Sequence, residues 1–294
     1  MCVRFWGRRN MVNSAVGVEH FNNTEPVLLS EVIHDVLGVN YEGFKELIWL
    51  GAIYVNNYRQ TKDKWILEPN SVFRVHTKPR RYPCDYDWKS LVVFQNESFL
   101  VLNKPSGIPS HPSVDNAIED ALTQTSLALK VPLLVTHRLD TLTSGLIVYG
   151  KQKSFVKNFN IQMLERHVQK KYSALVETAD TLPKSLTHYM DPAPGTPKKL
   201  SAGYNEGWEI CKLEILEQKE MSPGTKWVKI NLITGRTHQI RAQMAFLNAP
   251  IVGDRLYGAK NAYRANAIAL KSHQIEFSFD GKSMKFQLPE DVIQ

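Results

Sequence analysis

The sequence predicts an α+β fold with a mixed, largely antiparallel sheet and flanking helices, preceded by a smaller domain. Short apolar runs follow one another closely, and helical stretches fall among these runs at irregular intervals. Strands that neighbour strands in this way favour α+β architecture. The length of 294 residues is also enough for two domains.

The composition excludes several classes of protein. With 43% hydrophobic and 22% charged residues, the chain has the make-up of a globular protein and is not disordered throughout. No apolar run approaches the roughly 18–20 residues that a membrane span needs, which excludes an integral membrane protein. The cysteines, Cys2, Cys84 and Cys211, lie far apart, which excludes a disulfide scaffold and a cysteine-based zinc site. They fit a reducing compartment, and we expect a cytoplasmic monomer.

The charge balance favours an anionic partner. The formal net charge is +7, a surplus that is common in nucleic-acid-binding proteins and that also occurs in unrelated ones. The first 20 residues contain one acid, Glu19, and lack the apolar core of a secretory signal. We expect residues 1–20 to form a basic, disordered tail, with an organellar transit peptide as the alternative.

Residues 21–78 are interpreted as a small domain of two short helices and a hairpin. Apolar residues repeat at helical spacing in two stretches that Gly38 and Asn40 separate, and Gly51 ends the second stretch. Residues 53–55 then predict a strand, and Asn56-Asn57 predict a turn. The helical stretches are marked by Leu28, Val32, Val36 and Leu37, and by Phe44, Leu47, Ile48 and Leu50.

A linker and a larger domain follow. Residues 79–90 contain two prolines and no periodicity, which indicates a linker. The larger domain covers 91–294 and opens with a hairpin of two apolar runs, 91–94 and 99–102. Further strands are predicted at 145–149, 171–177, 208–216, 226–233 and 275–279, and helices near 116–130, 151–166 and 237–248.

A polar loop before a buried strand holds the first candidate for chemistry, Asp140. It ends the segment Thr-His-Arg-Leu-Asp at 136–140, and Leu146-Ile147-Val148 predict a buried strand that a loop enters at Gly145. A carboxylate in such a loop can accept hydrogen bonds and stay ionised. Considered alone, an Asp in this position is more often a loop-capping residue.

Two further segments hold candidate side chains. Arg236 lies between a predicted strand and a predicted helix, where it can meet a carboxylate from another loop, although a surface arginine is the plainer interpretation. Thr237 is a plausible N-cap of that helix. Tyr172 alternates with Ala174 and Val176 on one face of a predicted strand, a position where tyrosine usually belongs to the core.

Taken together, these segments resemble the RluA-like family of RNA pseudouridine synthases over about residues 91–294. The segment from Phe44 to Asn56 also resembles the S4-type RNA-binding domain, which commonly precedes such a core. The resemblance to the synthases is carried by ordered motifs: Lys104-Pro105-Ser106-Gly107, His137-Arg138-Leu139-Asp140 with Thr143-Ser144-Gly145-Leu146, the run from Gly235 to Arg241, and the run from Ala249 to Gly258.

The resemblance implies an isomerase that converts uridine in RNA to pseudouridine. Asp140 would act at the sugar, either by attack on C1′ or by removal of the 2′ proton, and the sequence does not choose between the two. Arg236 would hold Asp140 ionised by a charge-assisted pair, and Tyr172 would stack on the uracil and assist loss of the C5 proton. The residues expected to bind RNA are His137, Arg138, Thr143, Arg241 and Lys104.

The implied reaction requires neither a metal nor an organic cofactor, because it has no redox or hydrolytic step. The implied partner is ribosomal or transfer RNA, whose target uridine must leave its stack at a cost of a few kcal/mol. Two alternatives stay open: a non-catalytic RNA-binding or assembly protein that retains the synthase fold, and an S4-type module joined to an unrelated domain. The intact Asp140, Tyr172 and Arg236 argue against the first, and the ordered motifs argue against the second.

Overall fold

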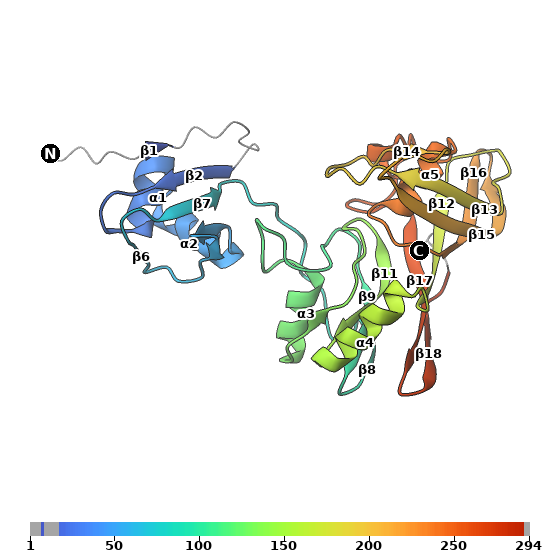
Figure 1. The fold of residues 1–294 in the computed structure, drawn as a ribbon, viewed down its shortest axis with the longest axis horizontal. Helices are drawn as coiled ribbons and strands as arrows, with labels where there is room; N and C mark the ends of the chain where they lie inside the picture. Colours follow the sequence, from blue (N-terminus) through green and yellow to red (C-terminus); the bar gives the residue numbers. More distant parts are fainter. Residues whose placement is uncertain (1–6, 9–17, 291–294) are drawn as a thin grey trace. The chain divides into compact units, whose positions relative to one another are not determined.

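The computed structural model of the protein describes residues 7–8 and 18–290, and the chain forms two compact units. The first unit comprises residues 1–84 and 111–124, and the second comprises residues 85–110 and 125–294. Helices lie at irregular intervals among mainly antiparallel strands, as in an α+β fold, so the predicted fold class is confirmed (Figure 1). No helix in the described part of the chain is long and apolar enough to cross a membrane.

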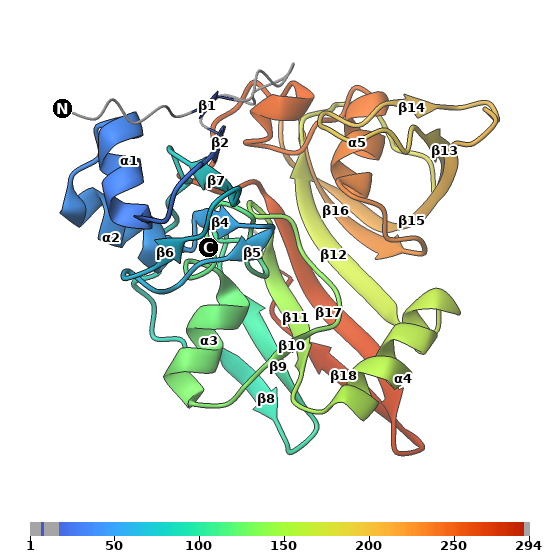
Figure 2. The same cartoon turned by 60° about the vertical axis from the view of Figure 1, so that its left-hand side comes forward.

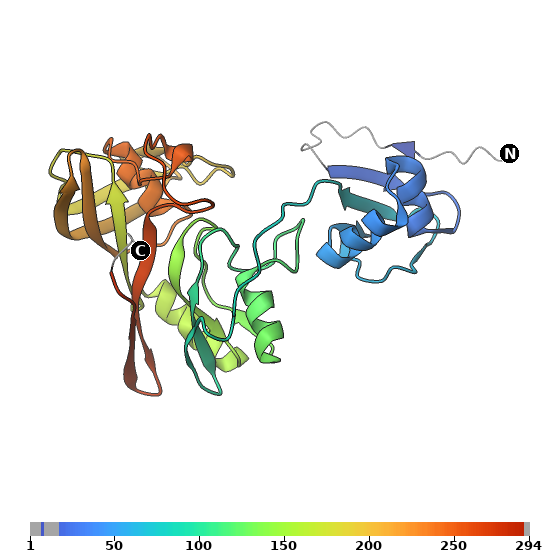
Figure 3. The same ribbon diagram turned by 180° about the vertical axis from the view of Figure 1, so that it is seen from behind.

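The first unit combines two helices with a small antiparallel sheet (Figure 3). Helices α1 (Leu29–Leu37) and α2 (Tyr41–Leu50) each end at a glycine in the left-handed conformation, Gly38 and Gly51, as predicted. The apolar faces of both helices pack with the sheet into one core. The sheet has the order β1 (Gly7–Arg8), β2 (Val18–Asn22), β7 (Val72–His76), β4 (Ile53–Val55) and β5 (Tyr58–Arg59), and β3 (Val27–Leu28) pairs separately with β6 (Ile66–Leu67).

The structure adds contacts at two of the predicted boundaries around this unit. The tail at 1–20 contributes β1 and the start of β2, because β2 pairs with β7 from Val18 onward, while the rest of the tail lies outside the described residues. The predicted linker at 79–90 is partly bound, since Arg80 pairs with Asp115 at 2.9 Å and Arg81 pairs with Glu119 at 2.7 Å. These pairs join residues 111–124 to the first unit, which ends inside the predicted linker.

The second unit is built on one large mixed sheet (Figure 2). All of its strand pairs are antiparallel except β11 with β17, which confirms the mainly antiparallel prediction. The order is β14 (Leu200–Ser201), β13 (Ser185–Met190), β15 (Glu209–Ser222), β16 (Thr225–Leu232), β12 (Gln169–Val176), β17 (Leu270–Phe279), β11 (Ser144–Gly150), β9 (Phe99–Lys104) and β8 (Val92–Gln95), with β10 (Leu134–Val135) on β11 and β18 (Lys282–Gln287) on β17.

Helices pack against this sheet in two places. Helix α4 (Lys153–Leu164) lays Phe155 and Phe159 onto a phenylalanine-rich core that includes Phe99 and Phe277. Helix α5 (Gln239–Phe246) packs Ala242 against Met190 and Cys211 of the other half of the sheet. The remaining helices are α3 (Ala121–Leu129), which begins later than predicted, and a 3₁₀ turn at Arg255–Tyr257.

Candidate active site

Asp140 lies in the loop from β10 to β11, and hydrogen bonds fix the course of this loop. The buried Leu139 donates its amide to Ser110 Oγ at 2.9 Å, and its carbonyl accepts from the same hydroxyl at 2.8 Å. The Thr143 amide donates to the Asp140 carbonyl at 3.0 Å. The Asp140 side chain is 21% exposed, so a fixed backbone presents a carboxylate that a ligand can reach.

Lys104 is buried beneath this loop and stabilises it from inside the protein. Its buried ammonium donates to the carbonyls of Pro105, Ile108 and Thr141 at 2.8, 2.9 and 3.4 Å. Burial lowers the pKa of Lys104 to about 7, and the charge of Asp140 acts in the opposite direction. The expectation that Lys104 binds RNA is therefore wrong, because its three donors are used inside the protein.

Arg241 is the arginine that contacts Asp140. Its Nη1 lies 3.4 Å from Asp140 Oδ2, while its Nε and Nη2 donate to the Asp254 carboxylate at 2.6 and 2.9 Å. The side chains of Arg241 and Asp254 are 4% and 0% exposed. Burial lowers the pKa of Arg241, but the hydrogen bonds and charges of Asp254 and Asp140 outweigh burial and raise it. This bidentate pair fixes the guanidinium beside Asp140, so Arg241 is not free to be the RNA contact that the sequence predicts.

The prediction that Arg236 pairs with Asp140 is wrong. Arg236 Nη1 lies 2.7 Å from Glu209 Oε1, and both side chains are more than a third exposed. The physical reason is the position of the helix start. His238 adopts a left-handed conformation as the N-cap of α5, which directs Arg241 into the buried side and leaves Arg236 in the preceding turn. Thr237 is therefore not the N-cap.

His238 and Tyr257 complete the surroundings of the Arg241 guanidinium. His238 Nε2 lies 2.8 Å from Arg241 Nη1, and an arginine can only donate, so Nε2 accepts and Nδ1 carries the proton. Nδ1 then donates to the Tyr257 hydroxyl at 3.2 Å, which also accepts from the Lys198 amide at 2.9 Å. Burial lowers the pKa of His238 although Asp140, 3.8 Å away, favours its charged form. The imidazole thus acts as a neutral acceptor.

Tyr172 lies in β12, close enough to Asp140 for the carboxylate charge to affect the pKa of its phenol. Burial raises the pKa of Tyr172 and the charge of Asp140 raises it further, whereas a hydrogen bond with Ser272 lowers it. The side chain is buried. The phenol is therefore protonated at neutral pH, and it is a poor base.

The remaining predicted RNA contacts divide into two kinds. His137 is half-buried; its Nε2 accepts from the Val148 amide at 3.1 Å, its ring stacks on Phe159, and burial lowers its pKa to about 3. Thr143 is 2% exposed. Burial therefore disfavours direct RNA contact for Thr143, and the Nε2 and ring of His137 are engaged inside the protein. Arg138 is exposed, and its Nη2 donates to Thr237 Oγ1 at 2.5 Å, so its predicted contact with RNA remains open.

Sequence reasoning missed Asp254, His238 and Tyr257 as members of the site. Two of them fall in the run from Ala249 to Gly258, which carried part of the resemblance, so a signal for them was present. A buried arginine also requires a carboxylate partner. No three His, Cys, Asp or Glu side chains in the described part of the chain group closely enough to hold a metal ion.

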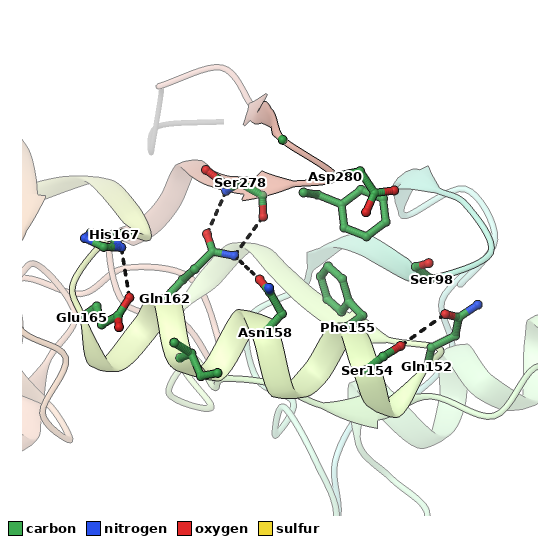
Figure 4. A pocket seen from close by; sticks show the side chains of 13 residues that line it. Ser98, Gln152, Ser154, Phe155, Asn158, Gln162, Glu165, His167, Ser278 and Asp280 are labelled. Atoms are coloured by element: carbon green, nitrogen blue, oxygen red, sulfur yellow. Dashed lines mark hydrogen bonds and ion pairs between the residues drawn. The ribbon is translucent and has the colours of Figure 1, made fainter.

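Away from Asp140, this unit has a groove of about 710 Å³ beside α4 (Figure 4). Gln162 spans it, with Oε1 accepting from the Ser278 amide at 2.8 Å and Nε2 donating to the Ser278 carbonyl at 2.9 Å. The carboxylates of Glu165 and Asp280 line the groove, and Asp140 does not. Two acids in an open groove disfavour RNA, so the Asp140 site is the stronger candidate.

Comparisons with known proteins match the part of the chain that carries Asp140. The family described as RNA pseudouridylate synthase matches residues 98–246, about half of the chain. This range contains Asp140, Tyr172 and Arg241. Asp254 lies just beyond it.

Individual relatives that match this chain are also named as pseudouridine synthases. The chain is 36% identical over 224 residues to a protein of Oryza sativa subsp. japonica named RNA pseudouridine synthase 6, chloroplastic, a match that covers 68% of this chain and 47% of that protein. It is 31% identical over 202 residues to ribosomal large subunit pseudouridine synthase C of Buchnera aphidicola, over 65% of this chain and 63% of that protein. This chain therefore spans about half the length of the plant relative.

A solved structure shares the fold. The human protein titled RNA Pseudouridylate Synthase Domain Containing 4 superposes with a TM-score of 0.54 at 21% identity, over 68% of this chain and 90% of that chain. At this identity the likeness concerns the fold alone.

Proposed function

We propose, because this chain belongs to the RNA pseudouridylate synthase family, that it isomerises uridines in RNA to pseudouridines. The family that the motifs predict is thereby confirmed. The observation that carries the proposed activity is the part-exposed carboxylate of Asp140, 3.4 Å from an arginine that a second, buried carboxylate holds in place.

The proposed reaction exchanges one bond for another at C1′ of the ribose. The N1–C1′ bond breaks, the uracil turns, C5 bonds to C1′, and the proton lost from C5 is balanced by one gained at N1. Asp140 acts at the sugar, either as a nucleophile at C1′ or as the base that removes the 2′ proton, and both roles need an ionised carboxylate. Arg241 stabilises that charge and orients the oxygen that it contacts.

Tyr172 and Arg138 are assigned to handling the base. The charge of Asp140 acts on the Tyr172 phenol, and this proximity supports stacking of the ring on uracil, whereas the protonated state of the phenol argues against proton transfer by its oxygen. The uridine has to leave its stack first, which costs a few kcal/mol. Arg138 is the exposed side chain of the motif, so it is the one that can occupy the space left by the flipped base.

Ribosomal RNA is the proposed substrate class, with transfer RNA as the alternative. The name of the Buchnera relative supports the first. We assign RNA binding also to the first unit, whose two short helices and hairpin support the S4-type interpretation of residues 21–78. The proposed working form is a monomer. Its compartment is the cytoplasm or an organelle, and the name of the rice relative supports the organelle.

Mapping of pseudouridines by chemical probing tests this function in cells with and without the protein. Loss of the protein should remove one or more pseudouridines. The wild type and Asp180→Asn, an exposed carboxylate in the same unit, should restore them, and Asp140→Asn should not. Unchanged pseudouridines after loss of the protein, or full restoration by Asp140→Asn, would contradict the proposal and favour a non-catalytic RNA-binding protein.

A further inference from the structure

Lys170, in β12, is a buried cation without an anion. The residue is 7% exposed, and its ammonium makes no hydrogen bond or ion pair with the residues that the structure describes. Lys104 differs, because three carbonyls surround its ammonium. Burial lowers the pKa of Lys170 to about 8, which reflects the lack of a compensating charge.

The ammonium lies beside the candidate active site. Lys170 precedes the site residue Tyr172 by two positions in β12. A Cβ atom placed on Gly235 would lie 3.2 Å from Lys170 Nζ, and the charge of Lys170 lowers the pKa of His137. The ammonium therefore lies near both loops of the site, the one that carries Asp140 and the one that leads to Arg241.

The surroundings of Lys170 leave room for an external partner. Burying an unpaired charge is costly, so a cation in this position favours binding of an anion. The Lys170 nitrogen, unpartnered within the described residues, is not completely sealed from solvent. Gly235 has no side chain to cover it, and a Cβ there would be in close contact with the nitrogen.

We propose that Lys170 binds a backbone phosphate of the RNA next to the target uridine. The inference rests on the proposed RNA substrate and does not depend on turnover. A phosphate carries the full negative charge that this ammonium lacks. A uracil oxygen is neutral and would leave the charge uncompensated.

The test compares Lys170→Met with Lys171→Met, which removes the same charge from the neighbouring, half-buried position of the same strand. The probe is a fluorescein-labelled single-stranded uridine oligonucleotide, titrated over a series of salt concentrations. Loss of one charge-assisted contact should weaken binding by Lys170→Met about tenfold. The slope of log K against log salt should become shallower by about 0.7, the value for one phosphate on a single strand. Lys171→Met should change both much less.

Thermal unfolding without RNA separates this role from a structural one. Removal of an uncompensated buried charge should leave the melting temperature of Lys170→Met equal to or above that of the wild type. Lys170→Gln, which keeps a hydrogen-bond donor without the charge, is the second variant if Met disturbs folding. A lower melting temperature in both variants would show an internal partner and overturn the inference.

Three binding results would also overturn it: an unchanged Kd, an unchanged salt slope, which would indicate a neutral partner such as a uracil oxygen, or an equal loss in Lys171→Met. The proposed function can be contradicted independently of the Lys170 contact. A wild-type protein that binds the oligonucleotide and never forms pseudouridine contradicts the enzyme assignment and leaves the Lys170 contact intact.

Discussion

Arg241 and Arg236 lie five positions apart in one motif, and their surroundings give them different roles. Arg241 is buried against Asp254 and directs its remaining nitrogen to Asp140, whereas Arg236 pairs with Glu209 at the surface. An exposed pair contributes about 0–1 kcal/mol. A buried pair is costly to break, because the partner left behind is an unpaired charge.

We therefore expect Arg241→Met to reduce turnover by about 10²-fold or more, as loss of a fixed electrostatic partner does. Its free energy of unfolding should fall by about 3–5 kcal/mol, because Asp254 is left buried and unpaired. Arg236→Met is the matched control and should change turnover little. Single-turnover kinetics and urea unfolding measure the two quantities.

A double variant separates the two effects of this change. Arg241→Met with Asp254→Leu also removes the stranded carboxylate, so stability should recover while turnover should not. Loss of turnover in Arg236→Met with normal turnover in Arg241→Met would reverse the assignment.

The start of strand β11 lies so close to strand β17 that only glycine fits at position 145. Gly145 has a φ of +110°, and a Cβ there would lie 2.2 Å from the Ser272 carbonyl oxygen of β17. This is the parallel contact of the sheet, and it places Ser272, the hydrogen-bond partner of Tyr172, next to the strand that follows the Asp140 loop. This backbone contact therefore fixes the point where the loop enters β11, in addition to the hydrogen bonds within the loop.

Gly145→Ala should lower the free energy of unfolding by about 3 kcal/mol or more, since it combines an unfavourable φ with a clash against backbone. Gly203→Ala is the control, because no atom lies within 4 Å of a Cβ at that position. Denaturant unfolding of both variants checks this. Equal stability of Gly145→Ala and the wild type would mean that the β11–β17 contact is looser than described.

Across the whole molecule, the local elements were predictable and the long-range contacts were not. Helices α1 and α2, their terminal glycines and the β8–β9 hairpin follow from periodicity and turn residues within short stretches. The attachment of residues 111–124 to the first unit depends on Arg80 and Arg81, more than 30 positions away. The choice of Arg241 over Arg236 depended likewise on Asp254 and on where α5 begins, which periodicity leaves uncertain by a few residues.

Two histidines that stay neutral in the folded protein make the stability of the second unit depend on pH. Burial lowers the pKa of His137 to about 3 and that of His273 to about 4. Between about pH 6.5 and 4 the unfolded chain binds protons at both positions while the folded chain does not, so stability falls as the pH falls. Asp120, in the first unit, acts in the opposite direction, because burial raises its pKa to about 6.

Comparison with the double variant His137→Gln, His273→Gln isolates this effect. Its free energy of unfolding should fall less steeply than that of the wild type between pH 6 and 4.5, by up to about 1.4 kcal/mol per pH unit for each histidine. Urea unfolding at several pH values measures the slopes. Parallel slopes for the two proteins would contradict the neutral state of these histidines.

The central claim, that Asp140 makes this chain an RNA pseudouridine synthase, is tested most directly by tritium release from RNA labelled with [5-³H]uridine. The wild type should release tritium, since formation of the C5–C1′ bond displaces the proton at C5. Asp140→Asn should release none while it still binds the RNA, because affinity comes mainly from the Lys and Arg residues. Release by Asp140→Asn at the wild-type rate, or no release by the wild type from any ribosomal or transfer RNA, would contradict the account.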